Sequence, residues 1–215
     1  MAQEIQGKVG YQGTPADGNL ADLRLARELA LVVGDGQGRY YEKSSRGQSF
    51  IASTAAAGIA HGSALTATGA LMLANPLGSG KNLSINRLVF GAVSGTLGVG
   101  QLWWCVGANP AALPAETTAA TRQCCLLNNT NSGDIAKAYS GVSLTTVPVV
   151  VRPSPIGYEG VVVATAETSF VPPQIEEVSG ELVVPPGFFV AVEGLGTAGT
   201  SPLVVLAISY DVISP

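Results

Sequence analysis

A single histidine limits the catalytic chemistry that this sequence could support. Any serine- or cysteine-based nucleophilic mechanism would have to use His61, because the chain has no other imidazole. His61 lies in the small-residue stretch Gly58–Ser63, which has no nucleophile-elbow pattern. We therefore interpret it as an ordinary surface or loop histidine and predict that the chain has no catalytic residues and is not an enzyme.

The cysteines and acidic residues give no metal-binding pattern. Cys124 and Cys125 are adjacent, so in a strand they would point to opposite faces and could neither share a metal nor form a disulfide easily. With Cys105 they make three cysteines, which we expect to be buried free thiols. The loop Asn128–Asp134 has oxygen ligands but one carboxylate, which favours a polar loop over a calcium site. We expect no metal and no cofactor.

Gly78-Ser79-Gly80-Lys81 contains the Gly-Lys pair of a phosphate-binding loop. The full motif also needs a glycine where this chain has Asn75, and a serine or threonine where it has Asn82. The segment precedes an expected strand rather than a helix, whose N-terminus would hold the phosphate. We predict a hairpin turn at this position and no nucleotide site.

Two pairs of neighbouring residues could place a side chain on each face of a strand. Glu176 and Glu177 would point to opposite faces, so they are poorly placed for glycoside hydrolysis, and we predict a solvated strand edge. Trp103 and Trp104 would divide in the same way, with one indole in the core and the other facing out. The outward indole could pack against a neighbouring subunit or stack on a sugar.

The elements that would position these residues are mostly β-strands. After Phe50 the chain shows short strand-like runs between glycine, proline and asparagine turns, a pattern typical of a sandwich, jelly roll or barrel. We expect strands at Leu65–Leu73, Leu83–Val93, Gln101–Val106, Gln123–Leu127, Val142–Val151, Val161–Thr165, Ile175–Val184, Phe188–Val192 and Leu203–Val212. The predicted fold class is therefore all-β, a jelly-roll-like β-sandwich with an extended N-terminal arm.

Charge divides the chain into two parts. Of its 26 charged residues, 12 lie in the first 50 positions, whereas the remaining 165 positions hold 14. We predict an N-terminal arm over residues 1–50 and a β-sandwich body over residues 51–215. Within the arm, Glu28–Val33 and Arg39–Glu42 could form a short hairpin around the turn Gly34–Gly38. A short helix over Leu20–Ala30 is the alternative.

Composition excludes several classes of protein. The chain is 47% hydrophobic and only 12% charged, the reverse of a disordered sequence. A net charge of −4 argues against nucleic-acid binding. We expect no signal peptide and no membrane helix, because the first 30 residues are interrupted by charges and the long uncharged stretches are broken by polar residues, glycine or proline. So little charge favours a body that is covered by other chains in an assembly.

Several stretches resemble structural proteins of tailed-phage virions. They are, in chain order, Gly7–Gly13, Ser45–Phe50, Leu73–Leu83, Val93–Gly98 and Val184–Val192. The resemblance implies a short arm, a jelly-roll-like body and no family active site. It also implies a capsid cement or decoration protein, made in the host cytoplasm and located on the capsid surface, which forms a homotrimer and bridges subunits of the major capsid protein.

This resemblance leads to two sets of expected contacts. The residues expected to contact the capsid are Lys8, Tyr11, Arg24, Arg27, Arg39, Tyr40, Tyr41 and Arg46. The residues expected to pack between subunits are Trp103, Trp104, Phe188 and Phe189. The alternative function is a tail or head-fibre component that binds carbohydrate through the outward tryptophan, with Tyr158 or Tyr210 as its partner.

Overall fold

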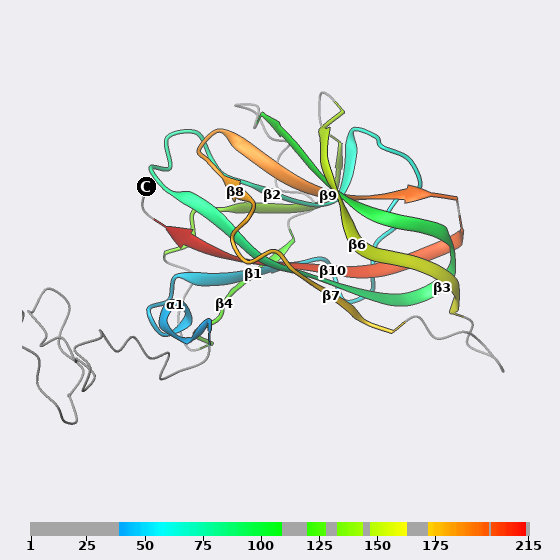
Figure 1. Ribbon diagram of the computed structural model, residues 1–215, viewed down its shortest axis with the longest axis horizontal. Coiled ribbons are helices and arrows are strands. Elements are labelled where there is room, and N and C mark those ends of the chain that lie inside the picture. Colours follow the sequence, from blue (N-terminus) through cyan, green and yellow to red (C-terminus); the bar gives the residue numbers. More distant parts are fainter. Residues whose placement is uncertain are drawn as a thin grey trace, which may run out of the picture. The chain divides into compact units, whose positions relative to one another are not determined.

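Ten strands and one short helix form the described part of the chain (Figure 1). The computed structural model describes residues 39–108, 120–127, 133–143, 147–162, 172–197 and 199–213. Tyr40–Pro215 form one compact unit, here called the body, which does not include Met1–Arg39. The strand expected at Glu28–Val33 and the alternative helix at Leu20–Ala30 lie outside the described residues. The elements are α1 (Tyr41–Ser45), β1 (Ser49–Ser53), β2 (Thr68–Ala74), β3 (Asn82–Ala108), β4 (Thr121–Cys124), β5 (Lys137–Ser143), β6 (Val149–Val162), β7 (Gln174–Glu177), β8 (Val183–Val184), β9 (Phe188–Gly196) and β10 (Thr200–Ile213).

The long strand β3 belongs to two layers of antiparallel strands. Its first part pairs with β10 on one side and with β7 and β8 on the other, and β1 and β4 extend this first layer beyond β10. Its second part pairs with β6 and β9, and β2 and β5 extend this second layer beyond β9. The predicted all-β, sandwich-like fold is confirmed.

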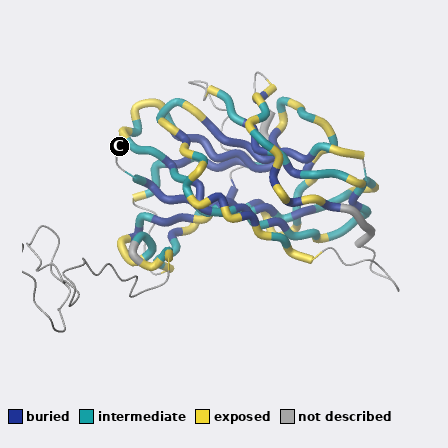
Figure 2. The backbone as a smooth tube through the Cα atoms, viewed as in Figure 1, coloured by how far each residue is buried: buried dark blue, intermediate teal, exposed yellow. Residues whose placement is uncertain are grey.

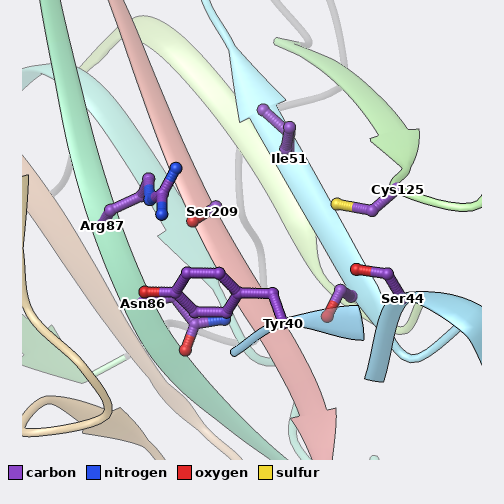
Figure 3. Close-up of a pocket in the computed structure, with 8 residues that line it drawn as sticks. Tyr40, Ser44, Ile51, Asn86, Arg87, Cys125 and Ser209 are labelled. Atoms are coloured by element: carbon purple, nitrogen blue, oxygen red, sulfur yellow. The ribbon is translucent and has the colours of Figure 1, made fainter. Parts of the chain in front are cut away.

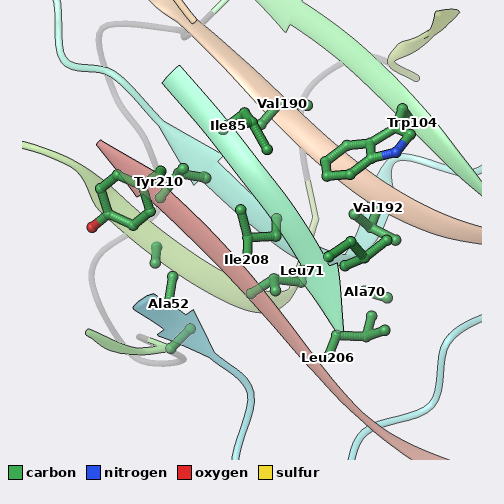
Figure 4. Close-up of a cluster of buried hydrophobic side chains, with 14 of the residues drawn as sticks. Ala52, Ala70, Leu71, Ile85, Trp104, Val190, Val192, Leu206, Ile208 and Tyr210 are labelled. Atoms are coloured by element: carbon green, nitrogen blue, oxygen red, sulfur yellow. The ribbon is translucent and has the colours of Figure 1, made fainter. Parts of the chain in front are cut away.

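The main core is built from buried side chains of both layers. Figure 2 shows stretches of buried residues along the strands of each layer. Along β10, alternate residues from Val204 to Val212 are buried, as expected for a strand with one face against a core. Leu206 and Ile208 from the first layer belong to the same cluster as Val190 and Val192 from the second (Figure 4). Burial of these side chains is the main force that holds the layers together.

A second apolar cluster covers the opposite face of the second layer. Its fully buried members are Met72, Ala74, Cys105, Tyr139, Phe189 and Ala191. Trp103 and Leu65 are partly buried and pack against them. The strands of the second layer are therefore apolar on both faces, and side chains of the same chain cover much of the outer face.

Several strands have different limits from those expected. Residues 95–100, which lie between the expected strands Leu83–Val93 and Gln101–Val106, are continuous strand within β3. Residues 153–157, which lie between the expected strands Val142–Val151 and Val161–Thr165, are inside β6. β6 pairs only with β3 among the described residues, so Pro153 and Pro155 fall on a strand with one free edge, where proline is tolerated. Conversely, the expected strand Ile175–Val184 consists of β7 and β8 separated by a turn.

The strand expected at Arg39–Glu42 is wrong, because α1 begins there instead. The Ser44 amide donates to the carbonyl of Tyr40, and Gly47, with a φ of 67°, ends the helix in the left-handed conformation that favours glycine. β1 then pairs with both β10 and β4. Residues 40–50, assigned by charge to the arm, therefore belong to the compact body.

The turn at residues 75–81 is not a hairpin. It joins β2 to β3, but these strands are not paired with each other, because β9 lies between them in the second layer. The hairpin predicted there is wrong, since glycine-rich turns can also join non-adjacent strands.

We predict that Gly95 is essential where β3 passes between the layers. Its φ is 82°, and a Cβ at this position would overlap the backbone of Ser201. Gly95→Ala should therefore lower the free energy of unfolding by about 2 kcal/mol or more, measured by urea denaturation. Gly91→Ala is the matched control in the same strand, because a Cβ there meets nothing within 4 Å. Equal effects of the two substitutions would contradict this role.

Candidate functional site

Asn75 joins two turns that lie far apart in the sequence. Its Nδ2 donates to the carbonyls of Lys81 and Val184, each at 2.8 Å, and its Oδ1 accepts from Ser79 Oγ at 2.6 Å. Its backbone also exchanges hydrogen bonds with the second turn, through Phe188 O and the amide of Gly187. Asn75 is fully buried, so these bonds are protected from water. We call the two turns, residues 75–81 and 185–188, the Asn75 tip.

The Asn75 tip holds large apolar side chains in solvent. Leu77 is 79% exposed and Phe188 is 43% exposed. Leu77 lies over Gly187, because a Cβ on that glycine would be 3.1 Å from Leu77 Cδ1. The hydrogen bonds of Asn75 fix the backbone beneath these side chains. The tip is therefore a preordered apolar surface of the kind found at protein interfaces.

A second exposed apolar row follows the free edge of β6. Val149 and Val151 are both exposed and lie two residues apart, on one face of the strand. Val147, just before the strand, is exposed as well. An edge strand with apolar side chains is a natural place for another chain to dock.

The structure separates the four residues expected to pack between subunits. Trp104 is fully buried in the main core, and Trp103 packs against the outer cluster, so the prediction that the two indoles face opposite sides is confirmed. Phe189 is buried in the outer cluster, whereas Phe188 is exposed at the Asn75 tip. Only Trp103, which is partly buried, and Phe188 present surface to a partner.

Half of the expected capsid-contact residues can be placed. Lys8, Tyr11, Arg24 and Arg27 lie outside the described residues. Arg39, Tyr41 and Arg46 are exposed.

Tyr40, another of the expected capsid-contact residues, is instead engaged within the body. Its hydroxyl donates to Glu177 Oε2 at 2.6 Å, and its ring lies 4.7 Å from the Arg87 guanidinium carbon. Arg87 Nη2 lies 3.0 Å from Glu177 Oε1, so the three side chains fasten α1 to the first layer.

Glu176 is buried, and the prediction that it lies on a solvated edge is wrong. Its Oε2 accepts from Trp104 Nε1 at 2.9 Å and from Ser154 Oγ at 2.6 Å. Its Oε1 lies 2.8 Å from Nη1 of Arg152. Glu176 comes from β7 in the first layer, whereas its three partners come from β3 and β6 in the second. The prediction that Glu176 and Glu177 point to opposite faces of the strand is confirmed. The inward carboxylate of Glu176, however, has a structural role, because its contacts link the two layers.

The two tyrosines suggested as sugar-stacking partners are both buried. Tyr158 packs against His61 and Phe90, with ring centroids 4.4 and 6.0 Å away. Tyr210 lies in the main core against Phe50, and its hydroxyl donates to Asp134 Oδ1 at 3.0 Å. Neither ring can stack on a sugar, so that part of the alternative hypothesis is wrong.

His61 lies in a loop but is buried, contrary to the surface position expected. Its Nδ1 is within hydrogen-bonding distance of Gly62 O, and its Nε2 has no hydrogen-bond partner among the described residues. Burial lowers the pKa of His61, although the Gly62 carbonyl opposes the shift. The neutral ring therefore packs against Tyr158 as part of the core.

Glu193 is a buried carboxylate on the outer face of the second layer. Its Oε2 accepts from the Thr66 amide at 3.1 Å, while Oε1 has no hydrogen-bond partner in the described part of the chain. Burial raises the pKa of Glu193, and the Thr66 hydrogen bond opposes the shift. Burial and the Glu193 charge together raise the pKa of Cys105 to about 12, so this thiol is neutral and unreactive.

The three cysteines are free thiols, as predicted. Cys105 and Cys124 are buried, whereas Cys125, which directly follows β4, is half-buried. In the described ranges, no three histidine, cysteine, aspartate or glutamate side chains are grouped so that they could hold a metal ion.

Comparison with known proteins gives no relative. No family model, no curated protein and no solved structure matches the chain. Within the described residues, no helix is both long enough and apolar enough to cross a membrane. The fold class and the surfaces described above are therefore the basis for a functional proposal.

The structural role of Asn75 was not predicted from the sequence. A usable signal was present, because asparagine before proline starts a turn, and Ser79 follows at a distance that suits a side-chain hydrogen bond. The partner turn could not be found in this way, since it lies more than a hundred residues further along the chain.

We predict that Asn75→Ala lowers the free energy of unfolding by about 3 kcal/mol. The substitution removes three side-chain hydrogen bonds and leaves buried polar groups without a partner. Urea denaturation gives the measurement. Asn82→Ala is the control, since this half-buried asparagine has no side-chain hydrogen bond among the described residues, and it should change stability by less than about 1 kcal/mol. An equally small decrease in the free energy of unfolding for Asn75→Ala would show that the stability of the tip does not depend on the Asn75 side chain.

We also predict that Glu193→Gln stabilises the protein at neutral pH. Folding raises the pKa of Glu193, so the native state binds this proton more tightly than the unfolded state does. The free energy of unfolding therefore falls as the pH rises from the pKa of an exposed carboxyl group through the raised pKa of Glu193. Removing the charge should add about 1 kcal/mol at neutral pH and little below pH ~4, where the carboxyl is protonated in both states. The exposed Glu181→Gln is the control. A gain that does not depend on pH would refute this explanation.

Proposed function

We propose that this chain is a structural protein of a phage virion, a capsid cement or decoration protein that bridges subunits of the major capsid protein. The observation that supports this function best is the Asn75 tip. Leu73–Leu83 and Val184–Val192, two of the stretches that resemble phage structural proteins, meet there through the hydrogen bonds of one buried asparagine. Together these two stretches form an apolar contact surface, which suits a protein that acts by binding to other proteins of a particle.

The composition of the body supports the same proposal. Residues 51–215 carry only 14 of the chain's 26 charges, and exposed valines follow the free edge of β6. A weakly charged surface with ordered apolar residues suits a molecule that is packed among other chains. The proposal includes a homotrimer, which rests on the resemblance to phage proteins rather than on any contact in this chain.

The N-terminal contacts fit this arrangement. Arg39, Tyr41 and Arg46 are all exposed. In the proposed function these side chains, with those of the preceding arm, contact the major capsid protein. The β-sandwich would supply the trimer and the tip would add a second point of attachment.

Quantitative mass spectrometry of the purified phage particle tests the proposal. We predict a copy number comparable with that of the major capsid protein. A copy number typical of tail or fibre proteins would instead favour the alternative function, and absence from the particle would refute both.

The same particles allow a matched test of the tip. Leu77→Asp and Leu127→Asp change two leucines that are 79% and 81% exposed, so neither substitution should unfold the body. Loss of one buried leucine from an interface costs about 2 kcal/mol, or a factor of roughly 30 in affinity. We therefore expect Leu77→Asp to reduce occupancy on capsids and Leu127→Asp to leave it unchanged. Full occupancy by Leu77→Asp would exclude the tip as a contact.

A further inference from the structure

The segment between β1 and β2 crosses from the first layer to the second. We call this segment, residues 54–66, the strap. Its first part is attached to β10, because Ile59 and Val204 exchange backbone hydrogen bonds of 2.8 and 2.9 Å. Its second part is attached to β9, where the amides of Gly194 and Gly196 donate to carbonyls of the strap at 3.0 Å each. The strap therefore links β10 of the first layer to β9 of the second.

The His61 side chain holds the second part of the strap in place. It is 3% exposed, whereas residues 60, 62, 64 and 66 of the strap are exposed. The His61 carbonyl accepts from the Gly194 amide, and the His61 ring lies against the same glycine. A Cβ on Gly194 would be 2.9 Å from His61 Nδ1 and 2.8 Å from the Tyr158 hydroxyl. The attachment of the strap to β9 therefore depends on the burial of this imidazole.

The hydrogen bonding of His61 favours an uncharged ring. Its Nδ1 lies within hydrogen-bonding distance of the Gly62 carbonyl, which assigns the proton of the neutral ring to Nδ1. Its Nε2 is buried and has no hydrogen-bond partner among the described residues. A second proton would bind at Nε2. It would place in the core both a positive charge and an N–H group without an acceptor, and each of these costs free energy.

The groups packed around His61 offer no negative charge to a protonated ring. The described ionisable side chains beside it are Tyr158 of β6 and Glu193 of β9. Burial raises the pKa of Tyr158 to about 12, so its hydroxyl stays neutral. Glu193 precedes Gly194, and its carboxylate lies on the opposite face of β9, where it accepts from the Thr66 amide. Burial is therefore the main cause that lowers the pKa of His61.

Arg87 also has a buried nitrogen without a partner, but it cannot respond to pH. It lines a pocket of about 160 Å³ with Ile51 and Ser209 of the first layer (Figure 3). Its Nε has no partner in the described part of the chain, while its Nη2 lies 3.0 Å from Glu177 Oε1. A guanidinium stays charged at every pH at which proteins fold. His61 differs, because its charge changes within the range in which the body is folded.

We propose that the strap is a pH-operated closure, which stays on β9 at neutral pH and detaches from it in acid while both layers remain folded. Protonation at Nε2 moves the His61 ring into water, where its charge is solvated, and the hydrogen bonds from Gly194 and Gly196 are then lost. The first part of the strap stays on β10 through the backbone of Ile59. Detachment uncovers Tyr158, which packs against His61. This proposal does not depend on the proposed function.

The direction of the pH effect follows from the two positions of His61. In the detached strap the imidazole has its ordinary pKa of about 6.5, whereas burial in the attached strap lowers this pKa. The detached state therefore binds more protons below about pH 6.5, and each further unit of pH favours detachment by up to about tenfold until the lowered pKa is reached. Glu193 acts in the opposite direction, because acid neutralises its buried carboxylate.

Amide hydrogen exchange of the full-length chain, followed by NMR, tests the proposal. Between about pH 7 and about pH 4.5, the protection of the Gly194 and Gly196 amides should fall by about tenfold or more after correction for the intrinsic exchange rate. The reference amides are residues 189–192, where β9 pairs with β2, and Ile51 and Ser209 at the pocket of the first layer. Their protection should change by less than about twofold. His61 is the only histidine, so its ring signals report protonation in the same samples.

Three variants show whether His61 is responsible. His61→Gln is uncharged at every pH and keeps an N–H group for the Gly62 carbonyl, so Gly194 and Gly196 should keep their protection in acid. His61→Phe, which keeps a ring against Tyr158, serves in the same way if His61→Gln does not fold. Glu193→Gln is the matched control. It removes the other buried ionisable group beside the strap, and it should lose the protection in acid as the natural chain does.

Four results would overturn the proposal. The first is unchanged protection of Gly194 and Gly196 in acid, and the second is an equal loss of protection at the reference amides, which would mean global unfolding. The third is the same acid response in His61→Gln or His61→Phe. The fourth is titration of the His61 ring while the two glycine amides remain protected. None of these results bears on the copy number in particles, so the strap and the proposed function are tested separately.

Discussion

Strand β3 has to satisfy hydrogen bonds in both layers of the sandwich, and the rest of the body depends on this requirement. It changes partner from β10 to β9 between Thr96 and Gly100, and on its other edge from β7 to β6 between Phe90 and Gly95. The layers are therefore joined covalently by a strand that never leaves the sheet. Glycine is needed where other backbone approaches too closely for a side chain, as Ser201 does at Gly95.

The continuity of β3 explains the position of the buried Glu176 network. Because one strand passes from layer to layer, β7 and β6 lie on the same side of β3 and their ends approach each other. Glu176 faces Trp104 and Ser154 across this junction, with Arg152 as its counter-ion. A buried ion pair contributes little net stability over an apolar contact, but it penalises any arrangement that leaves the charge unpaired. We interpret the network as fixing how the two layers meet.

Sequence patterns predicted the all-β class well, because alternation and turn residues are local signals. They also predicted that the two tryptophans would divide between faces. They could not predict that β3 and β6 continue through glycine and proline stretches, since continuity depends on partners far away in the chain. Burial of Glu176 and His61 depends in the same way on distant neighbours. The helix at Tyr41–Ser45 has a local signal in the sequence, the terminating Gly47. In β3, Ile85 pairs with Tyr210 and Arg87 with Ser209, so Asn86 forms a β-bulge, and its local signal is the three-residue interval between the inward Ile85 and Leu88.

The low charge of the body has two physical origins. One is internal: the second layer is apolar on both faces, and residues such as Met72, Tyr139 and Phe189 are covered within the chain itself. Their apolar character therefore needs no partner to explain it. The other origin is the Asn75 tip and the edge of β6, where Leu77 and Val149 remain exposed on ordered backbone. Because the internal cluster explains much of the apolar content, a contact between chains would involve these smaller patches rather than a whole face of the sandwich.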